Sequence, residues 1–272
     1  MTVKQKINEV QNLFLKNGID ASDAKWLVSY VLGPNFNLLS QAEITKKQEN
    51  KINKLAKLRL KRIPLSALQK SQNFYGLNFY VNNHVLTPRF ETEGLCEIVK
   101  NTVPNIKEKS GLDIGTGSGA IAVVLSKLFG AKMTAVDKSI FALFVARKNA
   151  KTNNAKIIIK KSNLFSNLKN KKFDFIVSNP PYVTNEEYKS LEPEVKKHDP
   201  KIALVGKNNG LQFYEKIISQ APKFLNPNGY LFFEIGYLQA NAVSKMLENN
   251  FKNIKIQKDL QNKDRYVFAQ LK

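Results

Sequence analysis

The sequence predicts an α/β fold, in which a doubly wound, seven-stranded mixed sheet follows a small helical domain and a β-hairpin linker. Three observations predict it. Apolar residues recur at helical spacing up to about residue 70, aromatic and β-branched residues dominate 73–86, and short apolar runs then alternate with helical segments. We therefore expect a helical domain at 1–70, a hairpin linker at 71–90 and an α/β domain at 91–272.

The first 70 residues are expected to form three helices. Apolar side chains at helical spacing predict a helix that starts near Val3 and stops at Asn17-Gly18. A second helix starts within the capping residues 20–23 and ends at Gly33-Pro34, and a third extends from about Glu43 to Arg62.

Strands and helices alternate in the rest of the chain. The expected strands are 111–114, 132–137, 156–160, 173–178, 230–235, 254–258 and 265–270. The expected helices are 91–101, 119–129, 139–152, 210–224 and 238–250. The last two strands can form an antiparallel edge hairpin, which makes the sheet mixed. A turn is expected at 226–229.

Composition limits the classes of function. With 272 residues the chain can form one α/β domain and an accessory domain without disulfides. A single cysteine, Cys96, excludes an intramolecular disulfide, and it makes no recognisable zinc pattern with His84 and His198, so no metal is expected. No uncharged apolar run approaches the ~20 residues needed to span a bilayer, and no targeting segment is expected, so the cytoplasm is the expected location.

The formal net charge of +21 predicts an anionic partner, with nucleic acid or a ribonucleoprotein as the first choices. Lysines are spread over nearly every segment, however, which a general compositional bias explains equally well. Diffuse charge of this kind supports weak, salt-sensitive association with ribosomes or nucleic acid.

A glycine turn lies between an expected strand and an expected helix, within 112–120. Gly115, Gly117 and Ala120 fit the dinucleotide-binding pattern, and Asp137 follows about twenty residues later, where it could bind a ribose diol. NAD binding is therefore one interpretation. Asp113 beside the first glycine would repel a pyrophosphate but could orient water or an amino group, which favours S-adenosylmethionine (SAM).

Asn179-Pro180-Pro181-Tyr182 follows the apolar run 173–178, at the edge where open α/β sheets bind ligands. Neither proline offers an N–H, so this segment is rich in hydrogen-bond acceptors. We expect Asn179 Oδ1 and the Pro180 carbonyl to accept one N–H each from a planar amino or amide group, with Tyr182 packed on its plane. Taken alone, the segment equally fits an ordinary proline-rich turn.

The chain resembles the class I, Rossmann-like SAM-dependent methyltransferases that modify exocyclic or amide nitrogens. The resemblance rests on three motifs in the expected order, namely 113–119, Asp137 and the Asn-Pro-Pro-Tyr segment. The stretch 85–93 is similar to the Pro-Arg-x-Glu-Thr-Glu signature of the HemK/PrmC family, the peptide chain release factor glutamine N5-methyltransferases. The similarity extends over most of the chain and includes Glu234-Ile235-Gly236 and the closing 258–265.

The resemblance implies methyl transfer from SAM to the side-chain amide nitrogen (N5) of the glutamine in the Gly-Gly-Gln loop of class I release factors, leaving S-adenosyl-L-homocysteine. It also implies that 1–70 recognises the substrate and that 91–272 is catalytic. The implied cofactor-binding residues are Asp113, Gly115, Thr116, Gly117, Ser118, Gly119, Asp137, Leu164 and Asn179. The implied substrate-binding residues are Arg89, Glu91, Asn179, Pro180, Pro181 and Tyr182, and the implied catalytic residues are Asn179, Pro180 and Tyr182. No general base is assigned.

Four places depart from the family pattern. Asn163 replaces an acidic residue next to adenine, Phe90 replaces a proline, and Asp199 replaces the glutamate that usually precedes the proline at 200. The loop at 205–207 lacks the usual paired glycines.

Two alternatives remain open. An amino methyltransferase for a nucleic-acid base or a ribosomal-protein glutamine would meet the same two N–H groups, and the +21 charge is compatible with it. A noncatalytic basic module that binds ribosomes or nucleic acid belongs to another class. It would leave Asp113, Asp137 and the Asn-Pro-Pro-Tyr segment without an evident purpose.

Overall fold

The computed structural model describes residues 1–33 and 42–272, which form two compact units. The first unit is Met1–Lys70 with Pro193–His198, and the second is Ser71–Glu192 with Asp199–Lys272. The division expected from sequence placed 193–198 in the α/β domain. In the structure these residues form the short helix α9 and cluster with the helical unit.

Four helices form the amino-terminal part of the helical unit: α1 (Val3–Lys16), α2 (Ser22–Leu32), α3 (Lys46–Leu60) and α4 (Leu65–Gln69). Thr2 and Thr45 cap α1 and α3, and both make complete capping boxes with a glutamine three residues later. The three predicted helices are therefore present. The predicted end of the second helix at Gly33-Pro34 is only partly testable, because α2 ends at Leu32 and Pro34 lies outside the described residues.

Ion pairs explain why α9 belongs to the helical unit. The Arg59 side chain on α3 is only 10% exposed, and its Nε lies 2.7 Å from Asp23 Oδ2 on α2. Its Nη1 lies 3.0 Å from Glu194 Oε1 on α9. A guanidinium buried to this extent requires carboxylate partners, and here α2 and α9 supply one each.

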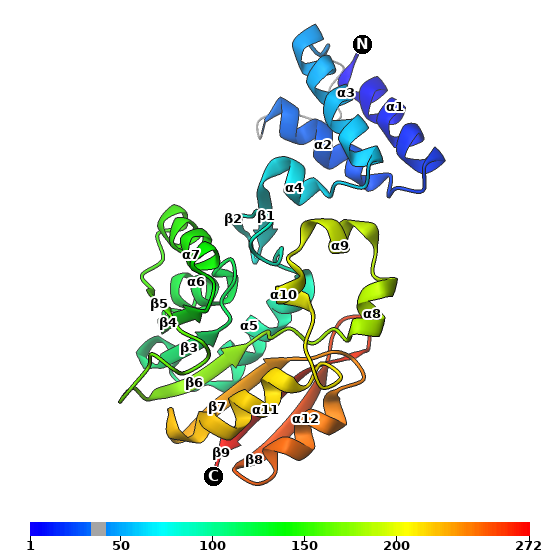
Figure 1. Cartoon of the computed structure of the whole chain (residues 1–272). Helices are drawn as coiled ribbons and strands as arrows, with labels where there is room; N and C mark the ends of the chain where they lie inside the picture. Colours follow the sequence, from blue (N-terminus) through cyan, green and yellow to red (C-terminus); the bar gives the residue numbers. More distant parts are fainter. Residues whose placement is uncertain (34–41) are drawn as a thin grey trace. The chain divides into compact units, whose positions relative to one another are not determined.

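Seven strands form the sheet of the α/β unit in the order β5-β4-β3-β6-β7-β9-β8 (Figure 1). Their bounds are β3 (Ser110–Ile114), β4 (Lys132–Asp137), β5 (Ile158–Lys161), β6 (Phe173–Ser178), β7 (Leu225–Glu234), β8 (Phe251–Lys258) and β9 (Asp264–Leu271). Strands β3 to β7 are parallel, whereas β9 pairs antiparallel with both β7 and β8. The predicted seven-stranded mixed sheet is confirmed.

Helices cover both faces of this sheet (Figure 1). One apolar core lies against α5 (Phe90–Thr102) and α6 (Ala120–Lys127) and reaches Ala150 of α7 (Ile140–Thr152). The opposite core includes α11 (Gln212–Gln220) and α12 (Ala240–Leu247). The five predicted helices are present. The central strands β3, β4 and β6 are buried on both faces, which accounts for their continuous apolar runs.

Several local features differ from the expectation. The hairpin is compact, with β1 (Ser71–Phe74) and β2 (Leu77–Tyr80) joined at Tyr75-Gly76. The turn predicted at 226–229 is a bulge inside β7, because the pairing passes directly from Leu225 to Tyr230 opposite β6. Short helices α8 (Asn185–Ser190), α9 and α10 (Lys201–Leu204) occupy a segment for which no element was predicted. Within the described ranges, no helix combines the length and the apolar character that a membrane span requires.

Candidate active site

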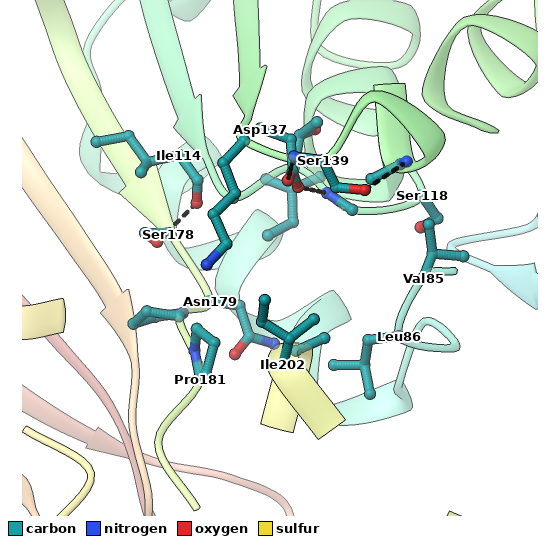
Figure 2. A pocket seen from close by; sticks show the side chains of 18 of the residues that line it. Val85, Leu86, Ile114, Ser118, Asp137, Ser139, Ser178, Asn179, Pro181 and Ile202 are labelled. Carbon is teal, nitrogen blue, oxygen red and sulfur yellow. Dashed lines mark hydrogen bonds between the residues drawn. The ribbon is translucent and has the colours of Figure 1, made fainter. Parts of the chain in front are cut away.

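A cavity of about 450 Å³ lies at the carboxyl ends of β3, β4 and β6. Its lining includes the glycine turn after β3, Asp137 at the end of β4 and Asn179 after β6. Figure 2 shows Asp137 and Ser139 on one side of this space, with Asn179 and Pro181 on the other. The three motifs that sequence analysis singled out therefore meet at the sheet edge where open α/β sheets bind ligands.

The glycine turn leaves room for a ligand close to the backbone. Gly115, Gly117 and Gly119 have φ values of +73°, +54° and +84°, which side chains disfavour. A Cβ added at Gly115 would meet no atom within 4 Å, whereas one at Gly119 would lie 3.1 Å from the Ala146 Cβ. The first glycine thus leaves open space beside the cavity that it lines, and the third permits close packing of α6 on α7.

Asp137 is positioned by backbone hydrogen bonds. Its Oδ2 accepts from the Gly117 N–H at 3.0 Å and its Oδ1 from the Ser139 N–H at 2.9 Å. Burial is the main influence on this carboxyl and raises its pKa, against the opposing effect of the two backbone donors. Each oxygen keeps further acceptor capacity toward the cavity, which suits a pair of hydroxyl groups.

Asp113 lies behind the turn rather than in the cavity lining. It is 1% exposed, and its Oδ2 accepts from the Thr116 hydroxyl at 2.6 Å. Burial raises the pKa of this carboxyl to about 7, and its Oδ1 has no hydrogen-bond partner among the described residues. Asp113 therefore braces the glycine turn, and direct contact with a ligand amino group stays a prediction.

The backbone around Tyr182 is enclosed by neighbouring loops. The Val183 N–H donates to the Leu204 carbonyl at 2.9 Å, and Gln239 Nε2 donates to the Tyr182 carbonyl at 3.1 Å. Gly210 has a φ of +80°, and a Cβ there would lie 2.0 Å from the Tyr182 oxygen. Glycine is thus required at this contact, and the segment after β6 has little freedom to move.

Asn179 lines the cavity, and a hydrogen bond holds its amide nitrogen. Its Nδ2 donates to the Thr92 hydroxyl at 3.1 Å, which leaves Oδ1 at the opposite end of the planar amide group. Among the described residues no donor reaches this oxygen or the Pro180 carbonyl, and both residues line the cavity. Two hydrogen-bond acceptors on adjacent cavity-lining residues are therefore without a donor within the described part of the chain.

Tyr182 has a different environment from the one expected. Its hydroxyl donates to Glu234 Oε1 at 3.3 Å, and it is absent from the cavity lining. Burial raises its pKa, so the hydroxyl remains neutral. Packing of its ring on a substrate amide stays a prediction.

The segment before α5 contributes a second ion pair. Arg89 lines the cavity and donates from Nη2 to Asp199 Oδ2 at 2.5 Å, while the Thr87 N–H donates to Asp199 Oδ1 at 3.0 Å. The aspartate at this position thus bridges two residues of the Pro-Arg stretch. Glu91 is outside the cavity lining, and its carbonyl accepts from the Tyr266 hydroxyl at 2.5 Å.

Asn163 and Leu164 both line the cavity. The Ser162 hydroxyl donates to the Leu164 carbonyl at 2.7 Å, and Leu164 has a φ of +51°. Ile202 and Phe213 extend the apolar lining, and sequence analysis did not select them as site residues. Ile202 lies in a segment without recognised periodicity, and an apolar residue such as Phe213 in a predicted helix is indistinguishable from a core residue. Thr92 was also missed, although it lies inside the Pro-Arg-x-Glu-Thr-Glu stretch.

The fold and the site are those of a class I SAM-dependent methyltransferase. The defining features are the strand order, the glycine turn after β3, the carboxylate at the end of β4 and the Asn-Pro-Pro-Tyr segment after β6. The profile of the methyltransferase small domain family matches residues 92–194. A solved methyltransferase from Pyrococcus furiosus has a similar fold, with a TM-score of 0.57 at 20% identity, covering 80% of this chain and 98% of that one.

Curated relatives identify the family. The chain is 41% identical over 266 residues to the release factor glutamine methyltransferase of Fusobacterium nucleatum, covering 93% of this chain and 75% of that protein. It is 33% identical over 285 residues to the release factor glutamine methyltransferase of Bacillus anthracis, covering 100% of each. The chain belongs to the release factor glutamine methyltransferase family.

Proposed function

We propose that this protein transfers a methyl group from SAM to the side-chain amide nitrogen (N5) of the glutamine in the Gly-Gly-Gln loop of class I peptide chain release factors. One observation supports the chemistry above all: Asn179 Oδ1 and the Pro180 carbonyl belong to adjacent cavity-lining residues, and no donor among the described residues reaches either oxygen. A primary carboxamide has two N–H donors in one plane, so it can satisfy both acceptors at once. The names of the relatives support the release factor as the substrate.

The residues that line the cavity suit SAM. The open space beside Gly115 would hold the methionine end, with the backbone from Gly115 to Gly119 and the Thr116 and Ser118 residues around it. Asp137 and Leu164 both line the cavity, where Asp137 would accept hydrogen bonds from the ribose hydroxyls and Leu164 would pack on adenine. SAM supplies an electrophilic methyl group on a sulfonium sulfur, and the product is S-adenosyl-L-homocysteine.

The amide nitrogen is a poor nucleophile because its lone pair is delocalised into the carbonyl. Asn179 Oδ1 and the Pro180 carbonyl each accept one N–H, which orients the nitrogen and favours the positive charge that develops on it. Fixed geometry can supply up to ~7–11 kcal/mol of barrier reduction, and one aligned polar contact about 3–4, so positioning suffices without a strong base. The proton leaves to water after methyl transfer.

The remaining assignments concern substrate recognition. Pro181, Tyr182, Arg89 and Glu91 complete the substrate-binding region, and Tyr182 packs against the amide once the substrate enters. The helical domain at 1–70 recognises the release factor, 71–90 links it to the catalytic domain at 91–272, and the enzyme acts in the cytoplasm. The position of Arg89 supports its role in substrate binding, since its 40% exposed side chain lines the cavity.

Mass mapping of the methylated atom tests the function. The protein is incubated with isotope-labelled SAM and, in separate reactions, with a class I release factor, ribosomal proteins or ribosomal RNA. We expect one methyl group on the Gly-Gly-Gln glutamine and little label elsewhere. Label on RNA or a ribosomal-protein glutamine, with none on the release factor, would favour the amino methyltransferase alternative. Absence of SAM binding would favour the noncatalytic one.

A lysine-rich face of α3 supports weak contact with ribosomal or other nucleic acid. Lys47 and Lys54 on α3 and Lys61 at its C-cap recur every seven residues, so they follow one side of the helix, and all three are exposed. Glu49 is the acidic residue of α3, and it pairs with Lys46 at 3.3 Å. Positive charge at intervals of two helical turns can follow a phosphate backbone.

We expect that Lys47→Gln, Lys54→Gln and Lys61→Gln, combined in one variant, lower the affinity for a single-stranded RNA oligonucleotide about tenfold at low salt. The slope of log K against log salt should fall by about 2, since each phosphate contact on a single strand contributes about 0.7. Fluorescence anisotropy at several salt concentrations measures both. A control variant carries glutamine at the exposed Lys223, Lys245 and Lys255. Equal losses in the two variants would show that only total charge matters.

A further inference from the structure

A buried chain of hydrogen bonds lies behind Asn179. Its Nδ2 donates to Thr92 Oγ1 at 3.1 Å, and the Thr92 hydroxyl donates to Glu234 Oε2 at 2.6 Å. Thr92 is 5% exposed and Glu234 2% exposed. The three side chains come from the segment after β6, the first turn of α5 and the end of β7, so the fold brings them together from distant parts of the sequence.

The chemistry of these groups fixes the direction of each hydrogen bond. An ionised carboxylate only accepts, so the single hydrogen of the Thr92 hydroxyl points at Glu234. The hydroxyl then offers only lone pairs to Asn179. The amide must turn its NH2 group toward Thr92, because the reverse orientation would place Oδ1 against another acceptor.

We propose that Thr92 and Glu234 are positioning residues for methyl transfer, in which the carboxylate orients the threonine hydroxyl and the hydroxyl holds the Asn179 amide with its oxygen toward the cavity. This inference rests on the proposed function. A reversed amide would present N–H groups to the substrate N–H groups, so donors would face donors and the carboxamide would lose half of its binding geometry. The pair thus sets the fraction of enzyme molecules that can hold the substrate productively.

The surroundings of Glu234 make this orientation sensitive to pH. Burial raises the pKa of its carboxyl to about 7, with a smaller raising effect from Glu91 on α5. Arg265 on β9 and the hydroxyls of Thr92 and Tyr182 favour the ionised form. The other titratable groups that interact with this carboxyl are those of Cys96, Tyr214 and Tyr266.

The direction of the pH effect follows from the number of hydrogens that the Glu234 carboxyl and the Thr92 hydroxyl can donate. Above pH about 7 the carboxyl is ionised and the Thr92 hydrogen is committed to it. Below that pH the protonated carboxyl can itself donate to Thr92, which releases the threonine hydrogen toward Asn179 and permits either amide orientation. We therefore expect kcat to fall as the pH is lowered through about 7.

Two substitutions of Thr92 test the proposal. Thr92→Val keeps the shape but removes the hydroxyl, whereas Thr92→Ser keeps the hydroxyl. With the release factor as substrate we expect Thr92→Val to lower kcat about 10- to 30-fold, a fall that corresponds to one oriented hydrogen bond, and Thr92→Ser to stay within about threefold of wild type. SAM affinity should be unchanged in both. The acid limb of the kcat profile should be absent in Thr92→Val and retained in Thr92→Ser.

Wild-type kcat in Thr92→Val, or equal losses in both variants, would overturn the proposal. Unfolding temperatures identify a variant that merely fails to fold, and a second measurement then decides without activity. In protein labelled with [15N]asparagine, the side-chain amide signals of Asn179 are assigned by their loss in Asn179→Asp. We expect slow hydrogen exchange of one amide proton in wild type and Thr92→Ser, and fast exchange in Thr92→Val.

The two readouts separate this proposal from the proposed function. A wild-type protein that shows the slowly exchanging Asn179 proton but methylates no release factor refutes the function and leaves the orientation of the amide intact. Equal exchange rates in wild type and Thr92→Val refute the orienting role, even where the release factor is methylated.

Discussion

Asn179→Ala will lower kcat for release factor methylation by about 10²- to 10³-fold, the loss expected when one aligned polar contact of a transition state is removed. The amide oxygen of Asn179 and the Pro180 carbonyl receive no donor from the residues that the structure describes, and one carbonyl alone would not fix both N–H groups of the substrate amide. The loss should appear in kcat, because the contact strengthens as positive charge develops on the substrate nitrogen that attacks the methyl group. Single-turnover kinetics with saturating release factor and SAM measure it.

Asn249→Ala, at an exposed position after α12, is the matched control and should have wild-type kinetics. The affinity of Asn179→Ala for SAM should stay within about twofold of wild type, because the other cofactor contacts are intact. Wild-type turnover in Asn179→Ala would remove the acceptor pair from the mechanism. A large loss of SAM affinity with little change in kcat would instead assign Asn179 to the cofactor alone.

The elements around the cavity were predictable because each depends on a local rule. Strand β6 is buried on both faces, so its apolar run is continuous, and the proline pair after Asn179 ends it. The turn at Gly115 requires positive φ, which glycine adopts at little cost. Local rules also place Asp137 at the end of β4, and the topology of a parallel sheet then brings these positions to one edge.

The contacts behind the cavity were not predictable, because they join residues far apart in the sequence. Thr92 and Glu234 are separated by 142 positions, and neither looks exceptional in its own segment. The position of Asp113 behind the turn also depends on packing, since a strand residue next to a glycine can face either side of the sheet. The short helices α8 to α10 lack the length over which periodicity can be recognised.

Asp137→Ala will weaken SAM binding by about 1.5–3 kcal/mol, or roughly 10- to 150-fold in Kd, through the loss of charge-assisted hydrogen bonds. The carboxylate lies at the end of β4 with both oxygens held by backbone N–H groups and with free acceptor capacity toward the cavity. Isothermal titration calorimetry with SAM and with S-adenosyl-L-homocysteine measures the change. Glu108→Ala, which removes an exposed carboxylate in the short helix before β3, is the control and should bind normally.

A double-mutant cycle distinguishes direct contact from bracing, because Asp137 also holds the N–H groups of Gly117 and Ser139. The second change is made in the ligand, as the 2′-deoxy analogue of S-adenosyl-L-homocysteine. If the carboxylate binds the ribose hydroxyls, wild type should lose about tenfold in affinity for the deoxy analogue and Asp137→Ala less than about twofold, since the partner is already absent. Equal losses in both proteins would mean that Asp137 only shapes the glycine turn, and unchanged affinity in Asp137→Ala would exclude it from the site.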